Sequence, residues 1–149
     1  MEGYNSANGG VMSFDGSNDY VNVPINIGAT ATFSMWTKTV KAASKMLFAL
    51  GSGTPGPDLY FKNNKIYWNT YDGEANPFCS ITSNLIGIWH NFTVVVENGS
   101  TKQYYDSVHI GTAIYKNPTK TSMQIGGHSG YFWSGLIDNV SVYNHGGIS

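Results

Sequence analysis

The chain of 149 residues contains no arginine, a single cysteine and few charged residues, which make up only 11% of it. Nucleic-acid binding usually needs a basic patch, and eight lysines balanced by nine acids do not supply one. The lone Cys79 cannot form an intrachain disulfide, so the fold does not depend on an oxidising compartment. No segment approaches the roughly 20 apolar residues of a transmembrane helix, so no membrane partner is predicted.

Signals for secretion and for a second domain are also missing. Residues 1–8 carry neither a basic region nor an apolar region, so no signal peptide is predicted. Residues 1–10 are small, polar and free of any strand pattern, and we predict an N-terminal arm there that could dock onto a partner. With no linker, internal repeat or low-complexity tract, residues 11–149 are predicted to form one domain.

The motifs of common enzyme classes are absent as well. The chain has no Gly-x-Ser-x-Gly, no His-Glu-x-x-His and no phosphate-binding loop. A glycosidase needs two carboxylates facing one sugar bond, and Glu2, Glu74 and Glu97 have no acidic partner at a suitable spacing. We therefore predict that the protein is not an enzyme.

What the chain does contain is a succession of short strand patterns separated by turn signals. Asn63-Asn64 and Asn98-Gly99 each lie between two strand patterns, as in two-residue hairpins. Strands are predicted at residues 11–15, 19–23, 31–39, 45–50, 58–62, 65–70, 78–82, 89–97, 101–106, 108–115, 122–126 and 131–143. Twelve short strands without a helical period indicate an all-β sandwich or barrel.

The strand at residues 31–39 carries large side chains on both faces. Phe33 and Met35 share one face, and Ser34, Trp36 and Lys38 share the other. A strand of this kind is expected in the middle of its sheet. Because Trp36 and Trp89 lie within strongly apolar runs, we expect both to pack in the core rather than to act as sugar platforms.

Five segments, in chain order, resemble the laminin-G-like domains of the concanavalin-A-like lectin/glucanase superfamily, in their short bacterial or viral form. The resemblance covers roughly residues 10–145 and implies a two-sheet antiparallel jelly-roll sandwich. Two departures are Asp106-Ser107, where Asp-Gly is usual, and Asn91, where a second histidine is common. The five segments are Phe14-Asp15-Gly16 with Asp19-Tyr20-Val21, Phe33-Ser34-Met35-Trp36, Ile88-Trp89-His90, Asn98-Gly99-Ser100 through Asp106-Ser107, and Ile125-Gly126-Gly127 with Gly135 through Tyr143.

Three aspartates are candidate metal ligands. In related jelly rolls an aspartate at the position of Asp138 binds a structural Ca²⁺ together with backbone carbonyls near the opening hairpin, which Asp15 and Asp19 flank. The chemistry is suitable, because Ca²⁺ takes six to eight oxygen ligands. The alternative is that Asp15 closes a turn through its own backbone and that Asp138 bonds amides of a neighbouring strand.

Two aromatic clusters are candidate binding surfaces. Tyr131, Trp133 and the aromatic residue between them follow a glycine-rich loop that contains His128. Three successive aromatic residues cannot all point inward from one strand. At least one should be exposed, where it could stack on a sugar or contact a protein. Trp68 and Tyr71 form the second cluster. The alternative for each cluster is packing between the sheets.

Two functional hypotheses follow from the sequence. The first is a surface recognition protein of a virion, such as a phage decoration or tail-associated protein, whose jelly roll binds glycans. The second is a free-standing lectin or adhesion module of a cellular protein. Both predict a glycan or protein partner at a virion surface or another extracellular location, and the first adds a capsid or tail assembly.

Overall fold

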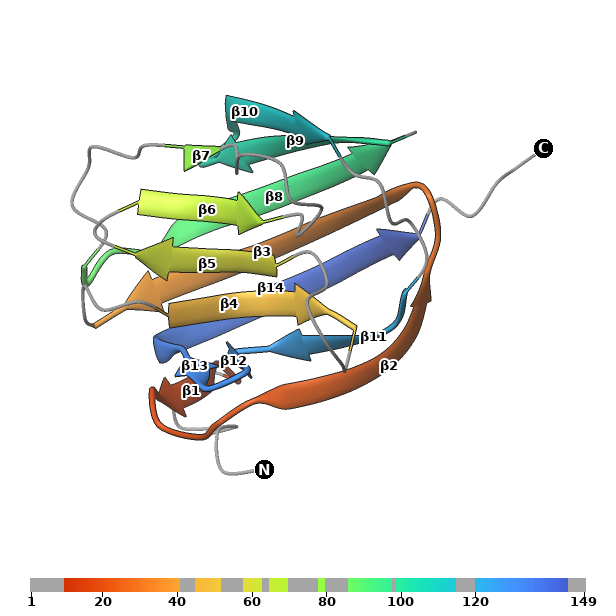
Figure 1. Ribbon diagram of the computed structural model, residues 1–149. Helices are drawn as coiled ribbons and strands as arrows, with labels where there is room; N and C mark the ends of the chain where they lie inside the picture. The colour runs from red at the N-terminus through yellow and green to blue at the C-terminus, as the bar shows by residue number, and fades with distance from the viewer. Residues whose placement is uncertain are drawn as a thin grey trace.

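The computed structural model describes residues 10–40, 45–51, 58–62, 65–69, 78–79, 86–97, 99–114 and 120–144. Within these residues the regular structure is all strand, arranged as two antiparallel sheets that face each other and a small hairpin (Figure 1). In the same residues, no helix is long and apolar enough to cross a membrane. The predicted two-sheet antiparallel jelly-roll sandwich is thus confirmed.

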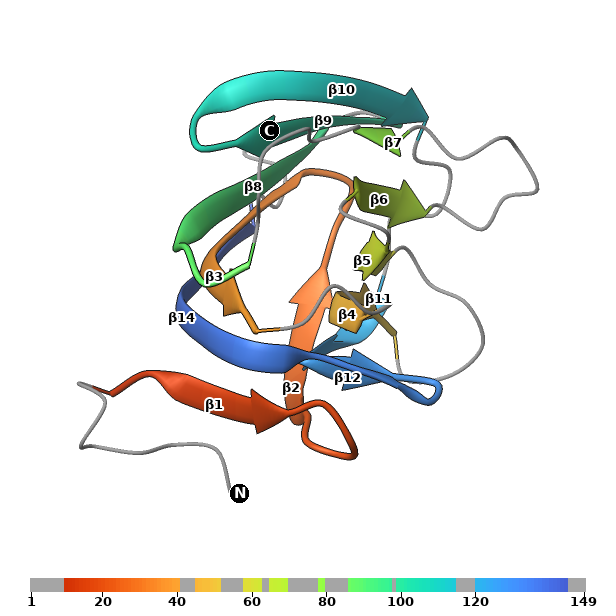
Figure 2. The same cartoon turned by 90° about the vertical axis from the view of Figure 1, so that its left-hand side faces the viewer.

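Sheet I has the strand order β1-β14-β3-β8-β9-β10, and sheet II has the order β2-β11-β4-β5-β6-β7. Figure 2 shows β14, β3 and β8 of sheet I on one side of the sandwich, opposite β4, β5 and β6 of sheet II. Sheet I comprises β1 (Met12–Asp15), β14 (Ser134–Asn144), β3 (Ala31–Thr39), β8 (His90–Glu97), β9 (Ser100–Tyr105) and β10 (Val108–Ile114). Sheet II comprises β2 (Val21–Ile27), β11 (Lys120–Ile125), β4 (Lys45–Leu50), β5 (Asp58–Lys62), β6 (Lys65–Asn69) and β7 (Phe78–Cys79).

The strand pairings expected on either side of both predicted hairpin turns are present, while Asn63, Asn64 and Asn98 lie outside the described residues. Lys62 pairs with Lys65, and Glu97 pairs with Ser100. The strand predicted to end at residue 23 continues through Pro24 to Ile27, because β2 is an edge strand in which a residue without an N–H is tolerated. The strand predicted at residues 131–143 is divided in two, since a hairpin of β12 (Gly127–His128) and β13 (Tyr131–Phe132) precedes β14.

The core lies between the two sheets. β3 alternates buried and more accessible positions, and its Phe33 stacks on Phe48 of sheet II with ring centroids 5.4 Å apart. Burying a side chain of this size contributes about 1.5–3 kcal/mol to folding. As expected, β3 lies inside its sheet, between β14 and β8. Buried residues that share this core include Met35, Leu47, Leu50, Leu59, Phe61, Phe92, Val94, Val96, Met123, Ile125 and Ile137.

The prediction that Trp36 packs in the core is wrong. Trp36 is 41% exposed, because β3 directs Phe33, Met35 and Thr37 inward and therefore directs Trp36 outward with Ser34. Trp89, which precedes β8, is half-buried rather than enclosed. The outer face of sheet I consequently presents an indole ring to solvent.

One carboxyl group lies buried in sheet II. Asp58 begins β5, where it pairs with Ala49 and Asn69, and it is 1% exposed. Its Oδ1 atom is buried without a hydrogen-bond partner, and burial raises the pKa of this carboxyl to about 7. Asp58 therefore holds its proton up to near-neutral pH, because desolvation disfavours the charged form.

Candidate functional site

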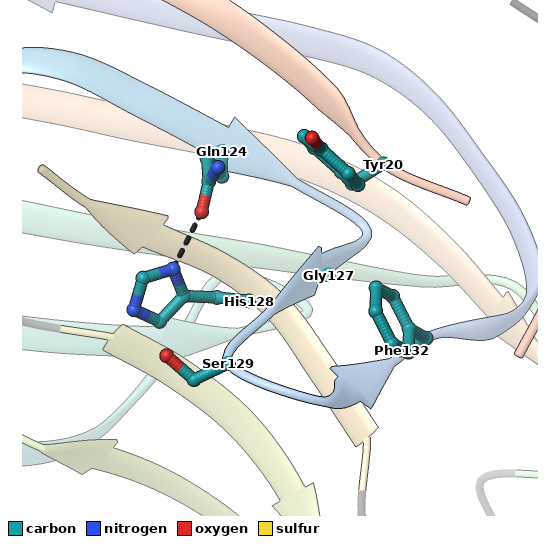
Figure 3. Close-up of a pocket in the computed structure, with 6 residues that line it drawn as sticks. All are labelled: Tyr20, Gln124, Gly127, His128, Ser129 and Phe132. Atoms are coloured by element: carbon teal, nitrogen blue, oxygen red, sulfur yellow. Dashed lines mark hydrogen bonds between the residues drawn. The ribbon is translucent and has the colours of Figure 1, made fainter. Parts of the chain in front are cut away.

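A pocket of about 270 Å³ opens where the β12–β13 hairpin meets the end of β11 and the residue before β2 (Figure 3). We call it the rim pocket. It brings together residues more than a hundred positions apart in the chain, which the two antiparallel sheets place at one end of the sandwich. The lining residues are Tyr20, Gln124, Gly127, His128, Ser129 and Phe132.

The hairpin that carries His128 is closed by a two-residue turn. His128 pairs with Tyr131, and the two residues between them have positive φ angles, 50° at Ser129 and 85° at Gly130. Positive φ at both central positions is the geometry of the type I′ turn that suits a twisted hairpin. The turn fixes Ser129 as an exposed residue at the edge of the pocket.

Gly127 is required by the close packing beneath the pocket. A Cβ atom at this position would lie 3.0 Å from Cε1 of Phe132 and 3.1 Å from the carbonyl oxygen of Asp19, with Cδ1 of Phe132 closer still. The absent side chain thus allows the Phe132 ring to rest on the backbone beside the loop that leads into β2. This contact joins the hairpin to Tyr20.

His128 is held in a defined orientation and in the neutral state. Its Nδ1 atom lies 2.5 Å from Oε1 of Gln124. Figure 3 marks this hydrogen bond with a dashed line. Desolvation by burial lowers the pKa of His128 below its usual value of 6.5, so the ring is uncharged at neutral pH. Because Oε1 can only accept, Nδ1 carries the proton, and Nε2 presents a lone pair that can accept a hydrogen bond.

The aromatic side of the pocket is partly open to solvent. Tyr20 is 53% exposed and Phe132 is half-buried, and both lie on the side of Gly127 opposite His128 (Figure 3). Neighbouring Tyr131 is 55% exposed, which confirms that at least one aromatic of residues 131–133 faces solvent. The site therefore pairs accessible ring faces with a neutral, oriented imidazole and a hydroxyl.

The prediction of Trp133 as a binding residue is wrong, because this residue is only 2% exposed and cannot stack on a ligand. Its ring meets Phe61 edge-on at 6.3 Å, and its Nε1–H donates to the Leu136 carbonyl at 3.4 Å. The cause is the break between β13 and β14, where the Trp133 N–H donates to the Gly126 carbonyl and the side chain turns inward. Of the predicted cluster, Tyr131 and His128 are accessible and Trp133 belongs to the core.

The second predicted aromatic cluster is only partly covered by the structure. The backbone of Trp68 lies in β6 opposite Leu59, whereas the Trp68 side chain and Tyr71 fall outside the described residues. Both remain predictions.

The three aspartates predicted as calcium ligands do not gather at one point. Asp15 accepts the Ser17 N–H at 2.7 Å, and Asp19 accepts the Asp15 N–H at 3.0 Å, so both close the loop between β1 and β2. Asp15 pairs with Ser134, four residues along β14 from Asp138, which is about 13 Å at the usual rise per residue.

Asp138 makes its own local contacts. Its Oδ1 accepts the Asn139 N–H at 2.7 Å, at a residue with φ of 49° where the register with β3 shifts. No group of three or more histidine, cysteine or acidic side chains in the described residues could hold a metal ion. These residues therefore do not fit a shared Ca²⁺ site, and calcium binding at Asp138 through backbone carbonyls stays a prediction.

Phe132 belongs to the predicted aromatic cluster, whereas Tyr20 and Gln124 were not predicted as site residues. Tyr20 directly follows the turn-closing Asp19 and precedes an edge strand, which favours exposure of its ring. For Gln124 the sequence offers no signal, because its role depends on the hairpin that brings His128 beside it.

The family model for laminin G domains of the concanavalin A-like lectin/glucanases superfamily matches residues 15–146. This match spans most of the chain, and the protein belongs to that family. The chain is also similar in fold to domains LG4-5 of the mouse laminin alpha1 chain, with a TM-score of 0.71 and 13% identity over 87% of this chain. It spans 40% of that laminin structure.

Two further solved structures are similar in fold. The heptameric SAP-like pentraxin of Limulus polyphemus has a TM-score of 0.69 at 15% identity, over 89% of this chain and 74% of its own. The CBM40 domain of the Ruminococcus gnavus IT-sialidase, bound to alpha2,3 sialyllactose, has a TM-score of 0.64 at 16% identity, over 90% and 91% of the two chains. No curated protein sequence matches this chain.

Proposed function

We propose that this protein is a non-catalytic carbohydrate-binding module and that the rim pocket holds a sugar ring. The observation that carries the proposal is that one pocket is lined by an exposed Tyr20 and by a neutral His128 whose orientation is fixed by Gln124. Aromatic faces cover the apolar side of a sugar, and a few oriented polar groups set specificity.

The polar groups of the pocket suit hydroxyl ligands. The Nε2 lone pair of His128 can accept a sugar O–H, and the Ser129 hydroxyl can donate or accept. Tyr20 and Phe132 offer ring surface on the other side of Gly127 (Figure 3). The sialyllactose held by the Ruminococcus domain of similar fold supports a sugar as the ligand class.

The same lining supports binding without catalysis. A glycosidase of the usual kind places two carboxyl groups on either side of the bond that it cleaves. None of the six residues that line the rim pocket has a carboxyl side chain. A sugar bound there would meet no acid and nucleophile pair.

A glycan array followed by calorimetry on the bound glycan tests this proposal with two variants. We expect Tyr20→Ala to weaken binding about 10-fold, since loss of an aromatic contact of this kind costs on the order of 1 kcal/mol or more. Tyr143→Ala is the matched control, because Tyr143 is similarly exposed on β14 and lines no part of the pocket. Equal affinity of the two variants, or no glycan bound by the native protein, would refute the assignment.

The setting that we propose for this module is the surface of a virion, as a decoration or tail-associated protein. The polar, strandless sequence of residues 1–10 supports it, because such an arm can dock onto a capsid or tail. Cosedimentation with the particle should be lost on deletion of residues 1–10 while glycan binding is kept. Retention of the truncated protein on the particle would contradict this attachment.

A further inference from the structure

A second cleft lies on the outer face of sheet I, far from the rim pocket in sheet order and sharing no residue with it. Its volume is about 570 Å³, within the range of small-molecule sites. The residues that line it are Trp36, Trp89, Asn91, Asp106 and Ser107. We call it the outer-face cleft.

The floor of the cleft follows one row across four strands. Trp36 pairs with Asp138 of β14 on one side and with Asn91 of β8 on the other. The Asp106 N–H, just beyond β9, donates to the Asn91 carbonyl at 2.9 Å and extends the row. Neighbouring strands lie about 4.8 Å apart, so the row measures about 14 Å from Asp138 to Asp106.

The polar floor beside Trp36 is immobilised by its own hydrogen bonds. The Asn91 Nδ2 donates to Oγ of Ser34 at 3.2 Å and to the Met35 carbonyl at 3.3 Å. The Thr93 hydroxyl donates to the Asn91 Oδ1 at 3.0 Å. Because both ends of its side-chain amide are hydrogen-bonded, Asn91 has a fixed orientation beside the indole ring. Its side chain therefore loses little conformational entropy when a ligand binds.

Asp106 is fixed in the same way and still has capacity to accept. Its Oδ1 accepts the Asn91 N–H at 2.8 Å, and its Oδ2 lies 2.8 Å from Nδ1 of His90. An ionised carboxylate offers about four acceptor positions, and these contacts use two of them. Because the Asp106 side chain is 42% exposed, its remaining acceptor positions can receive hydroxyl donors from solvent or from a ligand.

We propose that the outer-face cleft is a second carbohydrate subsite, selective for neutral pyranose rings. Trp36 supplies the stacking face, and Asp106 accepts hydroxyl groups of the stacked ring. This inference takes its ligand class from the proposed function, and its location is independent of the rim pocket.

The charges around the cleft favour a neutral ligand. Asp106 and Asp138 end the row on either side of Trp36, so a carboxylated or sulfated sugar would meet two like charges. Lys38 shares the outer face of β3 with Trp36, and its charge offsets one of the acids. One net negative formal charge remains around the cleft, so a cationic probe is needed to test whether a cation binds there instead of a neutral sugar.

In protein labelled with 5-fluorotryptophan, the fluorine resonance of Trp36 reports on this cleft, since Trp36 lines the cleft and no residue that lines the rim pocket is a tryptophan. The probes are neutral gluco-, manno- and galacto-oligosaccharides, sialyllactose as the anionic sugar and choline as the cation. We expect a neutral oligosaccharide to shift the Trp36 resonance, which the spectrum of Trp36→Phe assigns. Shifts with choline or sialyllactose alone, or with none of the probes, would overturn the inference.

Affinity measurements with substituted protein complete the test. Trp36→Ala should weaken binding of the neutral sugar at this site at least 10-fold, and the exposed Lys102→Ala on β9 is the control. Because Trp36 is outside the core, its removal should leave the melting temperature nearly unchanged. Binding that survives Trp36→Ala and is lost in Tyr20→Ala would refute the outer-face subsite and leave the rim-pocket proposal intact. The reverse result would refute the rim pocket alone.

Discussion

The rim pocket and the outer-face cleft are built from different kinds of backbone. The rim pocket collects side chains from a turn-closed hairpin, a strand end and a loop, whereas the cleft combines Trp36 and Asn91 of long paired strands with Asp106 and Ser107 of a turn. Strands hold side chains more precisely than loops do, and loops tolerate more sequence change. The comparison indicates that Trp36 and Asn91 in the floor of the cleft are held more precisely than Tyr20 and Ser129 at the rim.

The two regions also differ in how their polar groups are oriented. In the rim pocket a single contact between His128 and Gln124 orients the imidazole. In the cleft, Asn91 and Asp106 are joined to each other and to His90 by several hydrogen bonds. A network of this kind is worth more than its separate bonds, so a single polar substitution in the cleft should cost more than one in the rim pocket.

Of the substitutions considered, Gly127→Ala should produce the largest difference between the rim pocket and the outer-face cleft. The added Cβ would collide with the Phe132 ring and approach the Asp19 carbonyl, so we expect a loss of about 2 kcal/mol or more in the free energy of unfolding. Rim-pocket binding should disappear while the Trp36 resonance still responds to sugar. Urea denaturation and the fluorine spectrum measure both effects.

Gly130→Ala is the control for this substitution. A Cβ at Gly130 has open space around it and only the strain of φ at 85°, which costs about 1 kcal/mol. If Gly127→Ala proves no more harmful than Gly130→Ala, the packing of Phe132 against the Gly127 backbone is not what supports the pocket.

Asp58→Asn should remove a pH dependence of folding stability. In the native protein, this dependence would add to any pH dependence of ligand affinity measured at the two sites. The pKa of Asp58 is raised from 3.8 to about 7, so the folded state holds a proton that the unfolded state releases. Native stability from this group is complete below pH 4 and is lost as the pH rises through 7. Since three pKa units correspond to about 4 kcal/mol, we expect the variant to gain up to about 4 kcal/mol relative to the native protein at pH 8.

At pH 4 the variant and the native protein should be nearly equal in stability, because asparagine mimics the protonated carboxyl. Thermal melts at pH 4, 6 and 8 provide the measurement. A stability difference that stays constant across this range would show that Asp58 is not protonated in the native state.

A smaller effect is expected from His128, and it should affect the rim pocket alone. Its pKa is lowered by desolvation, so the ring stays neutral until the pH falls below 6.5 and through the lowered value. Protonation there replaces the Nε2 acceptor by a donor, and rim affinity should fall about 5-fold, equivalent to roughly 1 kcal/mol. Calorimetry between pH 7.5 and pH 4.5 would detect the fall.

His128→Gln keeps an acceptor and cannot titrate, so this part of the pH dependence should vanish in the variant. A native affinity that rises on acidification would contradict the assigned role of Nε2.

The smallest effect, and one confined to the cleft, is expected from Ser107→Gly. Asp106 and Ser107 form the turn between β9 and β10 with φ angles of 46° and 69°. Glycine adopts such angles without strain, so we expect a gain of about 0.5–1 kcal/mol in stability. Denaturant titration measures it, with Ser129→Gly in the rim hairpin as the matched variant. A loss of stability would mean that the Ser107 hydroxyl matters more than its backbone strain.

The alternating pattern in the sequence predicts most strands and the sandwich, because the period of two is local information. It fails where a side chain's position depends on distant elements. Trp36 shares its face with Ser34 and Lys38 in the sequence itself, so the alternation marked it as accessible, although its apolar neighbours favoured the core. Trp133 could not be placed, because its burial results from the break after β13 and from a space beside Phe61.

The rim pocket was predicted in part for the same reason. His128 and Phe132 come from the glycine-rich loop and the aromatic residues that follow it, and local sequence suffices to single out that segment. Gln124 comes from β11 and Tyr20 from the loop before β2, and only the tertiary structure brings them to this pocket.

Pro24 in β2 has a consequence for how copies of this protein can meet. β2 is one free edge of sheet II, and Pro24 offers no N–H there, beside a register shift opposite β11. An incoming strand could not complete a ladder on this edge, so the edge is protected against sheet-to-sheet aggregation. A module displayed in many copies at high local density would benefit from such an edge.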